Sequence, residues 1–312
     1  MKINDPFLMN LLENVSDGVY IVDKMRRISF WNSAAEAITG FHPDEVVGSF
    51  CMHNILNHVD EAGNKLCLGE CPLAAVLDDG KDHEASIFLH HRKGYRIPVN
   101  VRVLPLRDDS GEIQGAIEIF MEAAAGEVRS DQGGELEAHA GLMDPVTQLW
   151  DSHYVENFLQ DCLEKVRDFS RLPVGIILME IDGYPKLCQT ENRERCEQVV
   201  RTAALSIRGA LLPSDMLGRW GESGFLAVTG NTSSARMKKI AEQARILVEN
   251  STPLRDTENP LQMTISVGAT MVQGDDTVEA VLKRAEDRLY KCKESGGNQV
   301  CLDGSAVVTG QK

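Results

Sequence analysis

The sequence lacks an excess of basic residues, and it lacks an apolar run of transmembrane length. It holds 32 Lys and Arg against 47 Asp and Glu, a formal net charge of −15. Nucleic acids and anionic membranes attract clustered positive charge, so this composition argues against non-specific binding to either. The longest mainly apolar run, Leu172 to Ile181, is too short to span a bilayer, and the N-terminus lacks a signal-peptide pattern. We therefore expect a cytoplasmic protein that binds neither nucleic acid nor membrane.

The sequence also lacks a Cys-x-x-Cys pair. Its eight cysteines are spread over both halves without the framework of a small secreted domain, so we expect thiols or metal ligands rather than disulfides. Zinc favours thiolate and imidazole ligands, and iron–sulfur centres favour thiolates. Free cysteine is also among the most buried residue types, so buried thiols without a metal are the alternative. One cluster is a candidate metal or redox site: Cys51, Cys67 and Cys71 with the nearby His53 and His58.

The length of 312 residues exceeds what one compact domain usually needs, so we expect two domains. Residues 123–143 are rich in Ala, Gly, Glu and Gln, and Gly126, Gly133 and Gly134 would interrupt any helix there. The sequence thus predicts an N-terminal domain over 1–122, a linker over 123–143, a C-terminal domain over 144–305 and a flexible tail over 306–312.

Both halves combine helix and strand patterns, which predicts an α+β protein. In the N-terminal half, residues 14–31 predict two short strands, and residues 85–121 predict further strands because Val99, Val101 and Val103 alternate with polar residues. An antiparallel sheet with short flanking helices fits this pattern. From residue 151 to 289, helical and strand patterns alternate, which predicts a second sheet covered by helices.

Several co-linear motifs in the C-terminal half resemble the landmarks of GGDEF domains. Motifs in the right order and spacing are far more specific than any single one. The resemblance implies a nucleotidyl cyclase-like α/β sandwich and a homodimer. Members of this family make cyclic di-GMP from two GTP molecules. The matching segments are Asp144-Pro-Val-Thr-Gln-Leu149, Met179-Glu-Ile-Asp182, Gly218-Arg-Trp-Gly-Glu-Ser-Gly-Phe225, Thr264-Ile-Ser-Val-Gly268, and Ala285-Glu-Asp-Arg-Leu-Tyr290 with Gly296-Gly-Asn298.

The resemblance implies a metal site that this sequence has altered. The family's reaction needs carboxylates that hold divalent metal on the triphosphate. At the first metal position stands Glu180, next to Ile181, which keeps the charge but reaches one methylene further. In the signature turn, Ser223 replaces the second metal carboxylate and Gly224 replaces the catalytic Glu that follows it. The sequence thus predicts a degenerate catalytic site.

The signature turn reads Gly221-Glu222-Ser223-Gly224-Phe225, so one acidic residue remains in it. Adjacent side chains of a tight hairpin point to opposite faces, and a carboxylate shifted by one residue normally faces away from the site. We therefore do not expect Glu222 to replace the lost carboxylates.

The substrate positions implied by the resemblance are altered as well. Cys188 and Glu197 align with the family's guanine-reading Asn and Asp; Glu197 can still accept hydrogen bonds, whereas a thiol is a weak donor and acceptor. Lys293 keeps a phosphate-contacting position, but Gly297 stands where the family has an Arg.

The feedback-inhibition motif of the family, Arg-x-x-Asp, reads Leu212-Pro-Ser-Asp215 in this chain. Without the Arg, Asp215 alone is not expected to hold an anionic dinucleotide. A role as a cyclic di-GMP receptor through this site is therefore not expected.

The N-terminal half resembles a PAS sensor domain. PAS domains commonly bind a small ligand or cofactor, or pair with a second copy, and pass a conformational bias to an output domain. The segments that carry this resemblance, followed by strands through Met121, are Leu12-Glu-Asn-Val-Ser-Asp-Gly-Val-Tyr20, Ile28-Ser-Phe-Trp-Asn32, Ala35-Glu-Ala-Ile-Thr-Gly40 and Pro43-Asp-Glu-Val-Val-Gly48.

Together these patterns predict a cytoplasmic signalling protein with a PAS input domain and a catalytically inactive GGDEF domain. The GGDEF domain would act by dimerisation or by binding an unidentified protein partner. One alternative is a weakly active diguanylate cyclase in which Glu180, backbone carbonyls and the nucleotide phosphates hold Mg²⁺. A second is a GTP-binding switch without turnover, supported by Glu180, Glu197 and Lys293.

Overall fold

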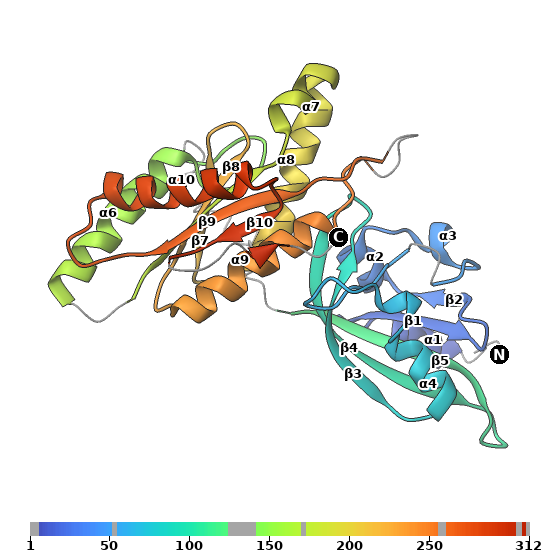
Figure 1. The fold of residues 1–312 in the computed structure, drawn as a ribbon. Helices are drawn as coiled ribbons and strands as arrows, with labels where there is room; N and C mark the ends of the chain where they lie inside the picture. Colours follow the sequence, from blue (N-terminus) through green and yellow to red (C-terminus); the bar gives the residue numbers. More distant parts are fainter. Residues whose placement is uncertain are drawn as a thin grey trace. The chain divides into compact units, whose positions relative to one another are not determined.

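The computed structural model describes residues 6–51, 55–123, 142–169, 173–254, 260–303 and 308–309. The chain divides into two compact units, Met1–Ala123 and Ala124–Lys312, which Figure 1 shows as ribbons. Most of the predicted linker, from 124 to 141, lies outside the described residues.

The N-terminal unit is built on a five-stranded sheet with the order β2-β1-β5-β4-β3. All neighbouring strands pair antiparallel, which confirms the predicted sheet. The last strand of this unit along the chain, β5, lies in the middle of the sheet and precedes the linker in the sequence. The strands are β1 Gly18–Asp23, β2 Ile28–Trp31, β3 His83–His90, β4 Arg96–Arg107 and β5 Ile113–Glu122.

Short helices accompany this sheet, as expected. The buried Asn32 caps the helix α2: its side-chain oxygen accepts hydrogen bonds from the backbone N–H of Ala35 and of Val19 in β1. One side chain thus ties the helix start to the sheet and satisfies a free N–H of the first turn. The helices are α1 Pro6–Glu13, α2 Ser33–Thr39, α3 Pro43–Val46 and α4 Pro72–Asp79, with the 3₁₀ turn η1 Leu66–Leu68.

The two faces of this sheet carry different apolar clusters. Tyr20 and Phe120 belong to the main core, whereas Ile117 and Ile119 belong to a smaller cluster on the other face. Since side chains alternate along a strand, Glu118 on β5 points into the main core. A carboxyl group therefore lies where the pattern calls for an apolar residue.

The C-terminal unit contains a six-stranded sheet with the order β11-β10-β9-β6-β8-β7. Strands β9 and β10 are parallel, and the other neighbours pair antiparallel. The central position of β6 places its C-terminal end beside the β7–β8 hairpin. The strands are β6 Gly175–Ile181, β7 Met216–Trp220, β8 Gly224–Thr229, β9 Ile265–Met271, β10 Gln299–Cys301 and β11 Val308–Thr309.

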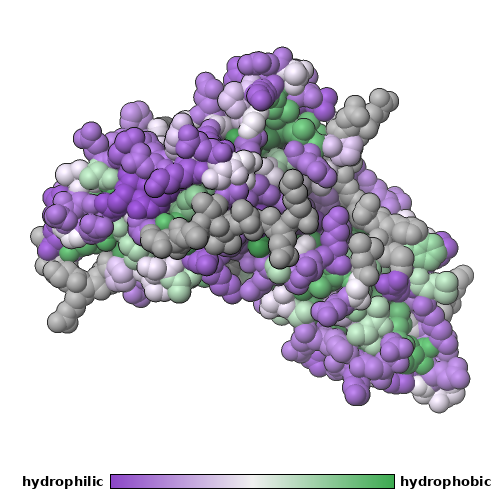
Figure 2. All heavy atoms as spheres, in the orientation of Figure 1, coloured by the Kyte–Doolittle hydropathy of each residue, from purple (hydrophilic) through white to green (hydrophobic). Residues whose placement is uncertain are grey.

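Helices cover both faces of this second sheet, which confirms the predicted α/β sandwich. Helices α8 (Arg193–Arg208) and α9 (Ser234–Glu249) pack on one face, and α6 (Ser152–Phe169) and α10 (Val278–Glu294) on the other. The short α7 (Tyr184–Thr190) joins β6 to α8. The outward surface of α6 and α10 is mainly hydrophilic (Figure 2), as expected for helices that turn one side to the core.

Residues 308 and 309 lie within the predicted flexible tail, but they form β11 and pair with β10 instead. An edge strand offers unpaired backbone N–H and C=O groups, so a short extended segment can add to it whatever its side chains. In the part of the chain that the structure describes, no helix has the length and apolar character needed to cross a membrane.

Candidate functional site

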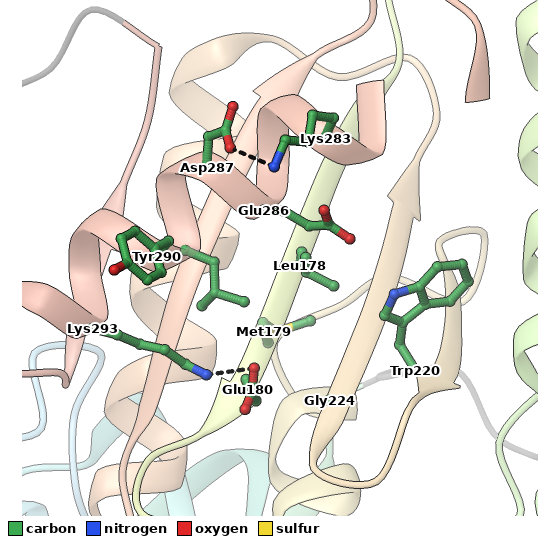
Figure 3. A pocket seen from close by; sticks show the side chains of 11 residues that line it. Leu178, Met179, Glu180, Trp220, Gly224, Lys283, Glu286, Asp287, Tyr290 and Lys293 are labelled. Atoms are coloured by element: carbon green, nitrogen blue, oxygen red, sulfur yellow. Dashed lines mark ion pairs between the residues drawn. The ribbon is translucent and has the colours of Figure 1, made fainter. Parts of the chain in front are cut away.

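A pocket of about 630 Å³ lies between α10 and the ends of β6, β7 and β8. Figure 3 shows charged side chains of α10 facing the strand ends across this pocket. It brings together three positions that the sequence marks as functional, on β6, in the signature hairpin and on α10. The lining residues are Leu178, Met179, Glu180, Trp220, Gly224, Lys283, Glu286, Asp287, Leu289, Tyr290 and Lys293.

Glu180 and Lys293 form an ion pair inside this pocket (Figure 3), with 2.5 Å between Glu180 Oε2 and Lys293 Nζ. Side chains alternate along β6, so Glu180 falls on the same face as Leu178 and points toward α10. The hydroxyl of Ser223 donates a hydrogen bond of 3.1 Å to the other oxygen, Oε1. Both oxygens of the carboxylate are therefore engaged by side chains of the same domain.

The signature hairpin keeps its turn geometry but contributes no carboxylate to the pocket. Gly221 has φ +68°, in the left-handed region that favours glycine. Ser223 is buried, and Gly224 pairs with Trp220 across the hairpin. A Cβ atom on Gly224 would lie 2.4 Å from the backbone oxygen of Trp220, closer than packing allows. This backbone leaves no room for a side chain where the family places its catalytic Glu.

Glu222 is exposed at the tip of the turn and does not line the pocket. Its backbone oxygen accepts a hydrogen bond from the Arg219 guanidinium, which stabilises the turn. The carboxylate of Glu222 therefore lies on the outside of the hairpin, while Trp220 and Gly224 face the pocket.

The donor set does not fit a divalent metal. Mg²⁺ is usually held by one or two carboxylates in near-octahedral geometry, but Glu180 is already paired and Ser223 donates to it. The neighbouring Asp182 accepts hydrogen bonds from Thr264 and Ser266, each 2.7 Å long, and from the backbone N–H of Asn298. Among the described residues, no three His, Cys, Asp or Glu side chains are arranged to hold a metal ion.

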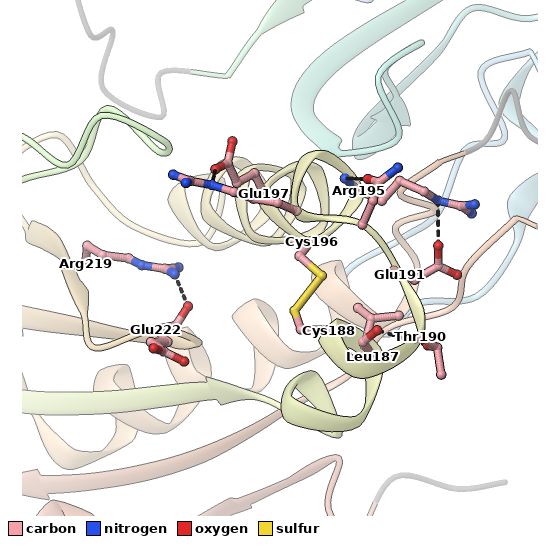
Figure 4. Close-up of a disulfide and its surroundings, with 11 residues drawn as sticks. Leu187, Cys188, Thr190, Glu191, Arg195, Cys196, Glu197, Arg219 and Glu222 are labelled. Atoms are coloured by element: carbon pink, nitrogen blue, oxygen red, sulfur yellow. Dashed lines mark hydrogen bonds and ion pairs between the residues drawn. A yellow bond between two sulfur atoms is a disulfide. The ribbon is translucent and has the colours of Figure 1, made fainter.

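The two guanine-reading positions lie on α7 and α8, outside the pocket. Cys188 is joined to Cys196 in a disulfide (Figure 4), with 5.9 Å between the Cα atoms. Glu197 pairs with Arg193, one helical turn earlier, at 2.7 Å. The structure thus does not bring these positions to Glu180 and Lys293.

A second disulfide joins Cys292 of α10 to Cys301 of β10, with 6.0 Å between the Cα atoms. The expectation that the cysteines are thiols or metal ligands is therefore wrong for Cys188, Cys196, Cys292 and Cys301. The reason is tertiary: the turn between α7 and α8, and the α10–β10 connection, bring each pair to the Cα separation typical of disulfides. Spacing along the chain does not reveal this.

Asp215, from the altered feedback motif, points into the domain. Its side chain is fully buried, pairs with Arg236 of α9 at 2.7 Å and accepts a 2.9 Å hydrogen bond from the backbone N–H of Leu212. Leu212 itself is half exposed. The carboxylate of Asp215 is thus used within the fold and does not face a surface ligand.

Among the candidate metal ligands of the N-terminal unit, His53 lies outside the described residues. Burial raises the pKa of the Cys51 thiol to about 12, with smaller contributions from Glu118 and from Cys71. Burial also raises the pKa of Cys67, which opposes formation of the thiolate that binds metal. A zinc or iron–sulfur site at this cysteine cluster remains a prediction. Metal analysis of the anaerobically purified protein would test it.

His58 is buried, and it belongs to a polar group that sequence reasoning missed. Its Nε2 lies 3.5 Å from Glu118 Oε1, and the Tyr20 hydroxyl donates a 2.8 Å hydrogen bond to Glu118 Oε2. The sequence offered one signal for this group: Glu118 stands at an inward-facing position of an otherwise apolar strand, and a buried carboxyl group requires polar partners.

Family models match both units. The model described as "Diguanylate cyclase, GGDEF domain" matches residues 141–299, just over half of the chain, and a PAS fold model matches residues 12–125.

Two curated proteins illustrate the sequence similarity. The response regulator PleD of Caulobacter vibrioides is 32% identical over 161 residues, which are 51% of this chain and 35% of PleD. The cyclic di-GMP phosphodiesterase PdeR of Escherichia coli is 21% identical over 300 residues, which are 95% of this chain and 43% of PdeR. The chain thus spans less than half the length of these two relatives.

Solved structures agree on the fold of the C-terminal unit. The GGDEF domain of DgcB from Caulobacter crescentus, in complex with c-di-GMP, has a TM-score of 0.50 and 21% identity, covering 53% of this chain and 96% of that one. The diguanylate cyclase SiaD of Pseudomonas aeruginosa, in complex with its activator SiaC, has a TM-score of 0.51 and 23% identity. The match covers 54% of this chain and 64% of the SiaD chain. At these identities the likeness shows the fold alone.

Proposed function

The chain belongs to the GGDEF family of diguanylate cyclase domains, and we propose that its GGDEF domain signals by binding rather than by making cyclic di-GMP. It is a diguanylate cyclase-like signalling protein with a PAS domain. In the proposal, the PAS domain receives an input and biases the GGDEF domain, which acts by dimerisation or by contact with a protein partner. The proposal includes a cytoplasmic location, where GTP and signalling partners are found.

One observation supports this proposal above the others: Glu180 and Lys293, the remaining metal and phosphate positions, neutralise each other at 2.5 Å. Phosphoryl transfer depends on charges that face the nucleotide and stabilise its transition state. With Ser223 and Gly224 in the turn, the hairpin supplies no further carboxylate. The match to the GGDEF family model together with this pairing of charges supports a domain that keeps the fold but not the reaction.

The decisive test incubates the purified full chain with GTP and Mg²⁺ or Mn²⁺ and measures cyclic di-GMP by mass spectrometry. We expect no product above that of a preparation of the Glu180→Ala variant. Product that forms in the original chain and is lost in Glu180→Ala would overturn the proposal and support the weakly active cyclase.

The second candidate function, a GTP-binding switch without turnover, is favoured by the size of the pocket, about 630 Å³, and by Lys293 in its lining. Calorimetric titration with a non-hydrolysable GTP analogue tests it. Binding that weakens in Lys293→Met but not in the matched variant Lys283→Met would support the switch, and no heat at millimolar analogue would exclude it.

The binding partner is either a second copy of the chain or another protein. SiaD was solved in complex with its activator SiaC, so a domain of this fold in that protein is found with a protein partner. Light scattering on the eluted full chain separates the two cases: a dimer would support self-association, and a monomer at micromolar concentration would direct attention to another protein.

A further inference from the structure

The helix α7 is attached to its domain by few contacts. None of its seven residues is buried, and its N-cap, Gly183, provides no side-chain hydrogen bond. Only the partly buried Tyr184 and Leu187 pack against the core. Elements with so little buried apolar surface open at low free-energy cost.

The disulfide Cys188–Cys196 supplies a covalent attachment for this helix (Figure 4). Cys196 is buried in α8, at 5% exposure, whereas Cys188 is exposed on α7. The crosslink therefore joins a weakly held surface helix to a firmly packed one, and the cysteine on the surface helix is an exposed residue.

Contacts lead from α7 to the signature hairpin. The Tyr184 hydroxyl lies close enough to the Arg219 guanidinium for the two groups to interact electrostatically. Arg219 in turn donates to the backbone oxygen of Glu222 at the tip of the hairpin. The helix also begins three residues after Ile181, the last residue of β6. The chain thus connects α7 to the end of β6, and Arg219 lies between α7 and the hairpin.

We propose that the Cys188–Cys196 disulfide is a redox-modifiable clamp that holds α7 on α8 and, through Tyr184 and Arg219, steadies the signature hairpin. In reducing compartments, disulfides are usually transient and redox-sensing, which fits this role. A regulatory role of the clamp rests on the proposed binding function. The reduction of the disulfide and the release of α7 do not depend on that function.

The reaction partner is a dithiol. Its thiolate attacks the sulfur of Cys188, the residue of the pair that is exposed, the S–S bond breaks, and Cys196 leaves as a thiolate that takes up a proton. The second thiol of the reagent then displaces Cys188 from the mixed disulfide. In sum, the protein disulfide gains two electrons and two protons, and the dithiol becomes a cyclic disulfide.

The same domain contains a matched control. Both sulfur-bearing residues of the second disulfide are buried, with Cys292 at 0% and Cys301 at 6% exposure. It also joins α10, which packs against the sheet, to β10, which is a strand of that sheet. Access governs thiol–disulfide exchange, so a reagent in solution should reach the first disulfide and not the second while the domain stays folded.

The test treats the full chain with graded dithiothreitol under native conditions, then alkylates free thiols and locates them by mass spectrometry. Hydrogen exchange of residues 184–190 and 216–224 is measured in both redox states. We expect Cys188 and Cys196 to be reduced at least ~10-fold faster than Cys292 and Cys301. Exchange in both segments should rise on reduction.

Two variants make the readout specific. Cys188→Ser should show the high exchange of the reduced state without reagent and should not respond to it. Cys162→Ser, which removes a free cysteine of α6, should behave like the original chain. Equal reduction of both disulfides, or exchange in 184–190 that is the same in both redox states, would overturn the proposal whatever the outcome of the cyclic di-GMP assay.

Discussion

The hydroxyl of Tyr20 donates a 2.8 Å hydrogen bond to Glu118 Oε2 in the core of the PAS domain. Both side chains are almost completely buried, and the Tyr20 ring also contacts Trp31. Glu118 lies on β5, the strand that leads toward the linker. Burial raises the pKa of the Glu118 carboxyl to about 7, which places its ionisation in the physiological range.

We predict that Glu118 destabilises the PAS domain increasingly as the pH rises from about 4.5 to 7. In this range the folded state keeps a proton that the unfolded state releases, so the free energy of unfolding falls as pH rises. Glu118→Gln removes this effect, and its stability relative to the original chain should increase by up to about 3 kcal/mol across this range.

The Glu118→Gln variant must be compared with the original chain at each pH, because buried histidines change the free energy of unfolding in the opposite direction. Burial lowers the pKa of His58 and of His91 to about 4, so each favours folding as the pH rises from about 4 to 6.5. Urea unfolding at several pH values measures the difference. Glu84→Gln, at an exposed position of β3, is the control; a pH-independent difference for Glu118→Gln would contradict the prediction.

Tyr20→Phe should weaken the PAS domain by about 1–2 kcal/mol, because it leaves a buried carboxyl oxygen without its donor. The hydrogen bond from Tyr20 lowers the pKa of Glu118 against the larger effect of burial, so its loss should raise that pKa further. Unfolding followed by fluorescence of the neighbouring Trp31 checks stability. If the effects of Tyr20→Phe and Glu118→Gln on stability simply add in the double variant, the two groups are not coupled.

Gly224→Ala should destabilise the GGDEF domain by about 1–3 kcal/mol, because a Cβ atom there meets a rigid backbone oxygen. Gly230→Ala is the matched control, since nothing lies within 4 Å of a Cβ at that position. Thermal unfolding of both variants measures the difference. Equal stability of the two variants would show that the hairpin backbone adjusts freely.

The same clash predicts that restoring the lost residues will not restore activity. The double substitution Ser223→Glu with Gly224→Glu should yield a less stable domain that makes no cyclic di-GMP from GTP and Mg²⁺. The product assay checks this, and cyclic di-GMP from a folded double variant would contradict it.

Asp215→Asn should cost about 1–3 kcal/mol, because it removes a fully buried charge partner of Arg236. The comparable substitution Asp287→Asn breaks the exposed ion pair with Lys283 and should cost less than about 0.5 kcal/mol. Chemical denaturation of both variants tests whether Asp215 stabilises the fold. Its position in the altered feedback motif does not by itself reveal such a role. If Asp215→Asn leaves the free energy of unfolding unchanged, Asp215 does not stabilise the fold.

Much of the architecture could be predicted from the sequence. Alternation at Val99, Val101 and Val103 predicted the antiparallel strand that became β4, and the helical patterns predicted the helices on both faces of the second sheet. Local patterns succeed here because burial of one face imposes the period of a strand or helix on the chain.

The candidate site was only partly predictable. The motif positions identified Glu180, Gly224 and Lys293, and the structure places all three around one pocket. The ion pair between Glu180 and Lys293 could not be predicted, because it depends on how α10 lies across β6. The two disulfides and the buried Glu118 were missed for the same reason: each depends on neighbours that are distant in sequence or on another element.

The sequence by itself determined that the chain carries a PAS and a GGDEF pattern, and that two acidic residues of the signature turn are absent. Residue identity and spacing are enough for both conclusions. The tertiary structure alone decided what the remaining groups do: Lys293 is paired with Glu180, Cys188 with Cys196 and Asp215 with Arg236. Charges and thiols act over a few ångströms, and only the folded chain sets which of them come that close.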